Sequence, residues 1–449
     1  MPRSHTLASH SDWRAGIRDP VNHVIVLLAL AFAVGGGGVA QGFNNLAVQL
    51  AALVLIGVHR VAFARFWVAA PRALNVLIAA TIALPLLHAL SLPPALWQSL
   101  PGRELAQEAL ALVGRDEAWF PFSLDRARSL TAAISLLPPL AIVALSWRMD
   151  EAQQSRLVLA LIAIAVAAVL LAGVQVATAG RLGQLYDEVP ARLVTGPFAN
   201  RNSFALFLAA GLALVLLGNH TLPFGRLGQA GVAAILLLGC LLSQSRSGMA
   251  LAMLVLLLFA VREIVTREKS ASRRGYAILA AIAVTIAAGG LAATNQRLSA
   301  TFDRFDELES TRAEIWEDGK FVAARYWPAG SGMGTFDEVF QVDETFDYLV
   351  PDRAGRAHND YLELAIEAGA VGLALLAAWI VWLLGAAARL PRRAAASTAR
   401  AAMTILALIA LQSIVDFPLR NQAMLCLAGL MIGLVASAIR TRIADPPEA

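Results

Sequence analysis

The sequence is poor in charge and nearly free of cysteine. Charged side chains make up 15% of the 449 residues and hydrophobic ones 58%, whereas about 25% of an average soluble protein is charged. The two cysteines, Cys240 and Cys426, lie in apolar stretches, where a thiol usually acts as a small buried hydrophobe. No Cys and His spacing is typical of a zinc site, and no basic patch interleaved with aromatic residues predicts nucleic-acid binding. These absences argue against an ordinary soluble enzyme, a zinc protein or a nucleic-acid-binding protein.

Long apolar stretches dominate instead, and the mean hydropathy is +0.64. A helix of roughly 17 to 25 apolar residues can span a bilayer, and a helix also satisfies its own backbone polar groups there. The chain is therefore predicted to be an all-α polytopic membrane protein with about 12 transmembrane helices. The first stretch is expected to be a retained helix and not a removed signal peptide. The stretches lie near 22–40, 44–59, 73–91, 129–147, 157–178, 202–218, 227–243, 248–262, 275–293, 362–388, 401–416 and 421–439.

Basic residues alternate with these stretches and predict the topology. With twelve spans, the arginine-rich connections and both termini fall on one side, which the positive-inside rule assigns to the cytoplasm. The opposite connections carry mixed charge and would face the periplasm. We therefore expect a multi-pass protein of the bacterial cytoplasmic (inner) membrane. The basic residues are Arg3, Arg14, Arg18, Arg60, Arg65, Arg72, Arg262, Arg267, Lys269, Arg273, Arg274, Arg389, Arg392, Arg393, Arg400, Arg440 and Arg442.

One long polar insert, from about Asn295 to Asp360, separates the ninth and tenth predicted helices. A connection of roughly 65 residues is far longer than usual, which indicates a functional or folded unit. The predicted organisation is helices one to nine at 1–294, a periplasmic loop domain at 295–360, and helices ten to twelve with a cytoplasmic tail at 361–449. Inside the insert we expect an amphipathic helix at 301–325, a glycine-rich turn at 330–334 and an acidic loop at 337–352.

Polar residues gather at the predicted outer connections. A single arginine at a helix end usually reaches for lipid headgroups, so each residue alone has a structural explanation. As a group, planar guanidinium forks suit the paired oxygens of a diphosphate, and a neutral imidazole can accept a proton from a hydroxyl. Together they predict a diphosphate clamp with a base, suited to group transfer. The candidates are Asn200, Arg201, Asn202, Ser245, Arg246, Arg312, Arg356, His358 and Asn359, with Asp416 and Arg420 as supporting residues.

Five short motifs in this order resemble the O-antigen ligase family, which is similar to the O-antigen polymerases. They are GPFANRNSFA at 196–205, SQSRSG at 243–248, RAEIW at 312–316, PAGSGMGTF at 328–336 and AHNDYLE at 357–363. The resemblance covers roughly 195–435, and the position of the insert agrees with it. The ending DFPLR at 416–420 looks like members associated with exopolysaccharide assembly.

The resemblance implies an inverting, metal-independent glycosyl transfer without a cofactor, on the outer side of the membrane. The donor would be a glycan on undecaprenyl diphosphate, and the acceptor a hydroxyl of another glycan or of lipid A–core. The family's diphosphate-binding arginines correspond to Arg201 and Arg246, with Arg312 as a further candidate, and its catalytic histidine corresponds to His358. The expected role is cell-surface polysaccharide biosynthesis, in contact with membrane lipids and with no nucleic acid.

Several alternatives remain open at this point. A lipid-linked glycan as acceptor would make the protein a repeat-unit polymerase for O-antigen or exopolysaccharide, and a pilin acceptor would make it a protein glycosyltransferase. A non-catalytic relative would bind the donor without releasing undecaprenyl diphosphate. A transporter of lipid-linked oligosaccharides belongs to a different class. Transporters place ionisable groups near the membrane midplane and often show repeated halves. In this sequence most helix interiors lack charge and no internal repeat is found. Glu363 and Glu367, early in the tenth predicted helix, are the ionisable residues nearest to a helix interior, and they too lie at its outer end.

Overall fold

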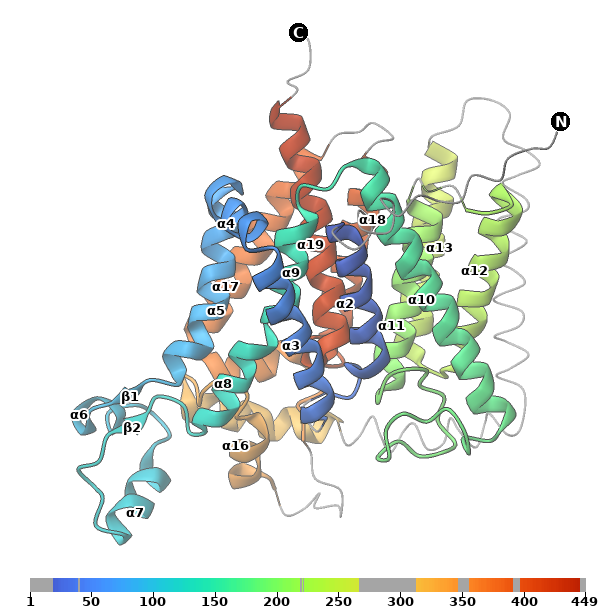
Figure 1. The fold of residues 1–449 in the computed structure, drawn as a ribbon. Helices are drawn as coiled ribbons and strands as arrows, with labels where there is room; N and C mark the ends of the chain where they lie inside the picture. Colours follow the sequence, from blue (N-terminus) through green and yellow to red (C-terminus); the bar gives the residue numbers. More distant parts are fainter. Residues whose placement is uncertain are drawn as a thin grey trace, which may run out of the picture.

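The computed structural model describes residues 19–38, 41–218, 220, 222–265, 312–345, 355–390 and 396–444. Regular structure in these residues is almost entirely helical (Figure 1). The exception is a small antiparallel sheet of β1 (Ser91–Leu92) and β2 (Phe120–Pro121). The helices are α2 (Pro20–Val34), α3 (Gly42–Val58), α4 (Arg60–Ala69), α5 (Arg72–His88), α6 (Pro94–Trp97), α7 (Glu104–Leu112), α8 (Arg126–Ser135), α9 (Leu137–Ser146), α10 (Glu151–Ala177), α11 (Arg201–Leu217), α12 (Gly225–Leu242), α13 (Arg246–Val265), α16 (Phe336–Asp343), α17 (Asp360–Arg389), α18 (Ser397–Gln412), the 3-10 turn η3 (Pro418–Arg420) and α19 (Gln422–Ala444).

Every predicted apolar stretch that falls on described residues contains a helix, which makes this a helical membrane protein. Six helices are long and apolar enough to cross a membrane, or up to seven if the bent pair α3 and α4 is one span. The apolar helices α2, α5, α11 and α18 are shorter, with 10–17 residues. The stretch 275–293, both ends of the chain and much of the insert lie outside the described residues. The count of twelve and the three-part division therefore stay predictions.

Helix α11 lies at the centre of the bundle. Its side chains are buried from Asn202 to Leu217, because the sequence places no charged residue after Arg201 in this helix. It packs against α12, α13 and α18, and α19 packs against α9, α18 and α2 (Figure 1). Phe207 of α11 stacks on Phe32 of α2, with ring centroids 4.1 Å apart. A helix buried in this way fixes the position of the residues at its start.

The connection after the second apolar stretch is helical, although the sequence predicts a simple basic connection. Helix α4 turns away from α3 by 82°, and its Phe66 is buried against Trp147, with ring centroids 5.7 Å apart. Helix α5 then runs the length of the bundle to His88, whose Nδ1 accepts a hydrogen bond of 3.1 Å from the backbone N–H of Met333. The α4 end and the end that holds the glycine-rich turn are therefore opposite ends of the bundle (Figure 1).

A small hairpin unit between α5 and α8 projects from the bundle beside the glycine-rich turn (Figure 1). Its Arg103 is fully buried and donates hydrogen bonds to the carbonyls of Phe122 (2.7 Å) and Gly330 (3.1 Å). Its guanidinium also lies 5.6 Å from the ring centroid of Tyr326. These contacts join the hairpin unit to the glycine-rich turn that follows the 312–326 helix.

The glycine-rich turn docks into a break in α17. At Gly369 the backbone leaves helical geometry, with φ of 53°, and exposes carbonyls that the turn satisfies. The N–H of Ser331 bonds to Ile366 O and that of Gly332 to Glu367 O, both at 2.9 Å. A Cβ on Gly369 would lie 2.1 Å from Pro328 O, so only glycine allows this approach. The motif is therefore a packed connection and not an ordinary flexible turn.

One local expectation for the insert needs correction, and another is tested only in part. The predicted acidic loop begins with a helix, α16, because Phe336 and Phe340 are buried and stack with ring centroids 5.1 Å apart. The predicted amphipathic helix is helical over 312–326, whereas 301–311 lies outside the described residues, as does 346–354. In addition α18 ends at Gln412 and not at Asp416, since Ser413 to Val415 form turns.

Candidate functional site

Four segments that are distant in the chain meet at the end of the bundle that holds the glycine-rich turn. They are the start of α11, the start of α13, the residues before α17, and the loop between α18 and η3. Side-chain hydrogen bonds of Asn200 and Ser245, and the electrostatic contact of His358 with Asp416, link these segments directly. We call this meeting point, defined by Arg201, Arg246, His358 and Asp416, the polar junction.

Asn200, Asn202 and Ser245 connect the starts of α11 and α13. The side-chain oxygen of Asn200 caps α11 by accepting from the N–H of Asn202 at 2.8 Å. The hydroxyl of Ser245 donates to Asn202 Oδ1 at 2.8 Å and accepts from the N–H of Gly248 at 3.0 Å. These polar side chains, expected from the sequence to bind substrate, thus hold the two arginine-bearing helix starts together.

Asp416 is the anchor of the polar junction. Its carboxylate is fully buried and accepts from Asn200 Nδ2 at 3.1 Å and from Gln412 Nε2 at 3.5 Å. Burial alone would raise the pKa of Asp416, but the bond and charge of His358, with Asn202 and Arg312, outweigh it and lower that pKa. Asp416 is therefore a buried anion at neutral pH.

His358 faces this anion. Its Nδ1 lies 3.5 Å from Asp416 Oδ1, an electrostatic contact longer than a good hydrogen bond. The Nδ1 atom is buried, yet 32% of the side chain is exposed, so the opposite edge of the ring is the accessible one. The ring packs edge-on against Phe417 at 4.9 Å, and the residue adopts a φ of 49°, unusual for a side chain of this size. A strained backbone and an aromatic neighbour thus hold the imidazole against Asp416.

Positive charge gathers beside the His358–Asp416 pair. Arg201, partly buried at the first turn of α11, interacts electrostatically with Arg246, Arg312 and Asp416. Arg246, at the start of α13, is exposed, and Arg312, at the start of the 312–326 helix, is half-buried. Guanidinium groups that lie this close to one another suit the paired oxygens of an anion such as a diphosphate.

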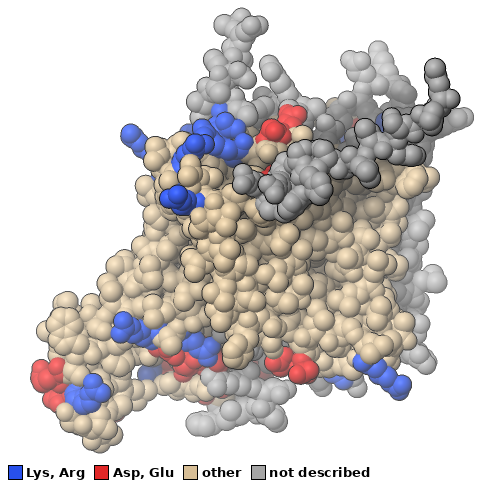
Figure 2. All heavy atoms as spheres, viewed as in Figure 1, with Lys and Arg blue, Asp and Glu red and all other residues tan. Residues whose placement is uncertain are grey.

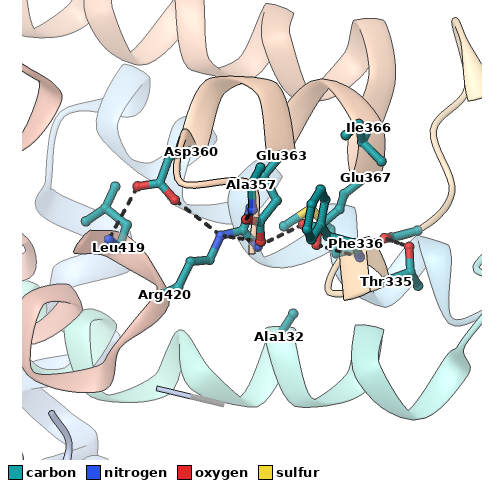
Figure 3. A network of polar contacts seen from close by, with 12 residues as sticks. Ala132, Thr335, Phe336, Ala357, Asp360, Glu363, Ile366, Glu367, Leu419 and Arg420 are labelled. Carbon is teal, nitrogen blue, oxygen red and sulfur yellow. Dashed lines mark hydrogen bonds and ion pairs between the residues drawn. The ribbon is translucent and has the colours of Figure 1, made fainter. Parts of the chain in front are cut away.

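A second network of ion pairs lies next to the polar junction (Figure 3). Arg420 of η3 reaches Glu367 Oε2 at 2.8 Å, and it reaches Asp360 Oδ1 and Glu363 Oε1 at 3.3 Å each. Arg356 binds the same oxygen of Glu363, with Nη1 2.5 Å from Oε1. Burial alone would lower the pKa of Arg420, but these carboxylates raise it. The network ties the first two turns of α17, and with them the preceding His358, to the loop that carries Asp416.

Arg420→Gln is expected to destabilise the fold by roughly 3–5 kcal/mol, because it leaves three buried carboxylates with Arg356 alone. The matched control is Arg325→Gln, which breaks an exposed pair with Asp343 and should cost about 0–1 kcal/mol. Thermal unfolding in detergent measures both. Equal shifts of the unfolding temperature in the two variants would contradict this structural role.

The structure brings most of the sequence-predicted site residues together. Arg201, Arg246, Arg312, His358 and Asp416 meet at the polar junction, while Asn200, Asn202 and Ser245 form its links. Two residues have other partners: Arg356 is paired with Glu363, and Asn359 caps α17 by accepting from the N–H groups of Tyr361 and Leu362. Arg420 lies in the adjacent network. Whether any of these residues binds substrate stays a prediction.

Sequence reasoning missed some residues of this region. Gln412 joins Asp416 to Ser247, donating to the hydroxyl of Ser247 at 3.0 Å, and a polar residue in an apolar helix was the available signal. Asp360, Glu363 and Glu367 follow a spacing of three and four residues, which places them on one face of α17. That spacing could have predicted a shared cationic partner.

Among the described residues, no three His, Cys, Asp or Glu side chains group as a metal site would require.

Comparisons with known proteins agree with the motif order. The family model described as O-antigen ligase matches residues 231–377. That range contains Arg246, Arg312 and His358, whereas Arg201 and Asp416 lie outside it. No curated protein matches the sequence significantly. Residues 231–377 are thus similar to the O-antigen ligase family, in agreement with the motifs.

Proposed function

We propose that this protein transfers a glycan from undecaprenyl diphosphate to an acceptor hydroxyl at the polar junction, on the periplasmic side of the inner membrane. The observation that carries the proposal is the arrangement of His358, with one ring edge toward a buried carboxylate and the other accessible, beside three arginines. The family is one of glycosyltransferase-like enzymes, with lipid-linked glycans and polysaccharides as general substrates. The donor, the stereochemistry and the topology are part of the proposal.

The chemistry assigns a role to each group. The Asp416 carboxylate favours the His358 tautomer that carries its proton on Nδ1, which leaves Nε2 free to act as a base. Nε2 takes the proton of the acceptor hydroxyl as that oxygen attacks the anomeric carbon. The bond from this carbon to the diphosphate oxygen breaks on the opposite face, so the configuration inverts. The leaving diphosphate takes the electron pair, and Arg201, Arg246 and Arg312 stabilise its negative charge.

The test is transfer by the purified full chain in liposomes that contain a glycan on undecaprenyl diphosphate. We expect release of undecaprenyl diphosphate in step with glycosylated acceptor, inverted anomeric configuration by NMR, and unchanged rates in EDTA. Separate reactions supply lipid A–core or a second lipid-linked glycan as acceptor, which distinguishes ligase from polymerase. Movement of the donor across the bilayer without release of undecaprenyl diphosphate would favour a transporter and overturn the proposal.

The buried acidic residues of α17 give the transporter alternative less support than the proposed glycan transfer. Glu363 and Glu367, the ionisable residues nearest to a helix interior in the sequence analysis, are both fully buried and paired with Arg420. A proton or ion pathway would need such carboxylates to change partner during each cycle. Their place in a fixed network favours a structural role instead.

Asp416→Asn is expected to reduce transfer by about a hundredfold or more, since the amide no longer selects the productive His358 tautomer.

The buried Asp416 carboxylate also predicts a pH effect on stability. Because folding lowers the pKa of Asp416, its stabilising contribution is present above the unfolded-state pKa, about 4, and is lost as pH falls through the lower folded value. The difference in unfolding temperature between the wild type and Asp416→Asn should therefore shrink below pH ~4. A difference that grows on acidification would contradict the assignment.

A further inference from the structure

A shallow basic cavity, largely open to the surface, lies at the α4 end of the bundle, opposite the polar junction. It has a volume of about 490 Å³ and is lined by Arg60, Arg65 and Arg148 together with Val61, Ala64 and Val68. Figure 2 shows arginine and lysine side chains gathered at this end beside a smaller group of acidic side chains. The cavity thus combines three guanidinium groups with an aliphatic wall.

Among the described residues, no acidic side chain pairs with the arginines of this cavity. Within the part of the chain that the structure describes, no carboxylate lies within ion-pair distance of the three arginines. Arg148 instead stacks over the buried ring of Trp147, 5.1 Å from its centroid. Planar guanidinium groups bind phosphate oxygens in pairs. The polar part of the cavity therefore suits a phosphate group.

The apolar part suits a hydrocarbon chain. Helix α4 turns 82° from α3, and α5 then leads back through the bundle, so α4 lies across the ends of helices that span the membrane. Its side chains Val61 and Val68 are 54% and 87% exposed beside the arginines. Aliphatic residues next to arginines on a helix of this orientation are typical of an interfacial helix, with one side in the acyl region and the other among headgroups.

We infer that the cavity between α4 and Arg148 binds an anionic phospholipid, with its phosphate on Arg60, Arg65 and Arg148 and an acyl chain along Val61 and Val68. Free phosphate shares the headgroup chemistry but would leave the aliphatic wall exposed, so the lipid is the better occupant. This site is separate from the polar junction because it lies at the other end of the bundle. It does not depend on the proposed transfer reaction.

Native mass spectrometry of the full chain in a neutral detergent tests the inference. Phosphatidylglycerol and phosphatidylcholine with the same acyl chains are titrated in two separate series. In a third series, inorganic phosphate competes with bound phosphatidylglycerol. Each basic residue near an anionic headgroup is worth about fivefold in affinity, so Arg65→Gln should weaken phosphatidylglycerol binding about fivefold. The matched control is Arg226→Gln, an exposed arginine at the start of α12 and the same end of the bundle, which should bind as the wild type does.

A triple variant, Arg60→Gln with Arg65→Gln and Arg148→Gln, should lose about a hundredfold in affinity. All three side chains are exposed, so the thermal unfolding of the triple variant should match that of the wild type. If it does not, the affinity of Arg65→Gln alone decides the test. Equal binding of phosphatidylcholine and phosphatidylglycerol would overturn the inference. So would wild-type affinity in the triple variant, or full displacement of the lipid by equimolar inorganic phosphate.

Discussion

His358→Ala is expected to lower the turnover number for glycan transfer by about a thousandfold, with little change in the KM for the lipid-linked donor. A positioned general base contributes about 10²–10⁴ in rate, and His358 is the accessible base of the polar junction, held by Asp416 and Phe417. The donor diphosphate is assigned to the arginines and not to the imidazole. The rate should therefore fall while donor binding persists.

The matched control for this variant is His220→Ala. His220 contacts the hydroxyl of Thr398 at 3.2 Å, beyond the end of α11 that is opposite Arg201, so its loss should leave turnover unchanged. Thermal unfolding of both variants separates a loss of catalysis from a loss of fold. Wild-type turnover in His358→Ala would remove the base from the mechanism, whereas a matched fall in both variants would indicate damage to the bundle.

Arg246→Ala and Arg201→Ala are each expected to reduce turnover by roughly 100- to 1,000-fold, the cost of removing one group that stabilises a developing charge. Arg201 interacts electrostatically with Arg246 and Arg312, so the three act on one region, where the leaving diphosphate would carry its charge. Arg201→Lys should retain part of the rate, because an ammonium keeps the charge but loses the paired hydrogen bonds.

The decisive comparison uses donors that differ only in phosphate number. The wild type should prefer a glycan on undecaprenyl diphosphate over one on the monophosphate, and Arg246→Ala should narrow that preference. Arg226→Gln at the opposite end of the bundle again serves as the control, with an unchanged preference expected. If Arg246→Ala slowed both donors by the same factor, the arginine would support the fold or the acceptor and not the diphosphate.

Hydrophobic pattern predicted the helices well because it is a local property of the chain. The stretch 202–218 carries no charge, and the structure buries it as α11 at the centre of the bundle. The pattern failed where a helix is short and mixed in composition. Helix α4 contains arginines among aromatic and aliphatic residues and is held by Phe66 against Trp147, a residue about eighty positions away. Helix α16 likewise depends on the burial of Phe336 and Phe340.

In the candidate site, too, the sequence predicted some residues and could not predict their contacts. Arg201, Arg246, Arg312 and His358 stand out in the sequence because each is a polar residue beside an apolar stretch, and their motif order indicates the family. Their partners could not be assigned, since Asp416 contacts His358 and Asn200 from a loop far along the chain. Arg356 shows the limit most clearly, because the sequence suggests a substrate ligand and the structure pairs it with Glu363.

By itself, the sequence determined that this is a helical membrane protein and that residues 231–377 resemble the O-antigen ligase family, because apolar length and short ordered motifs can be read without knowing any contact. Tertiary structure alone decided that Asp416 faces His358, that Arg420 gathers three carboxylates, and that glycines at 330 and 369 lock a turn into a broken helix. The physical reason is that hydrogen bonds and ion pairs act over a few ångströms in space. Which groups come that close depends on how the whole bundle packs.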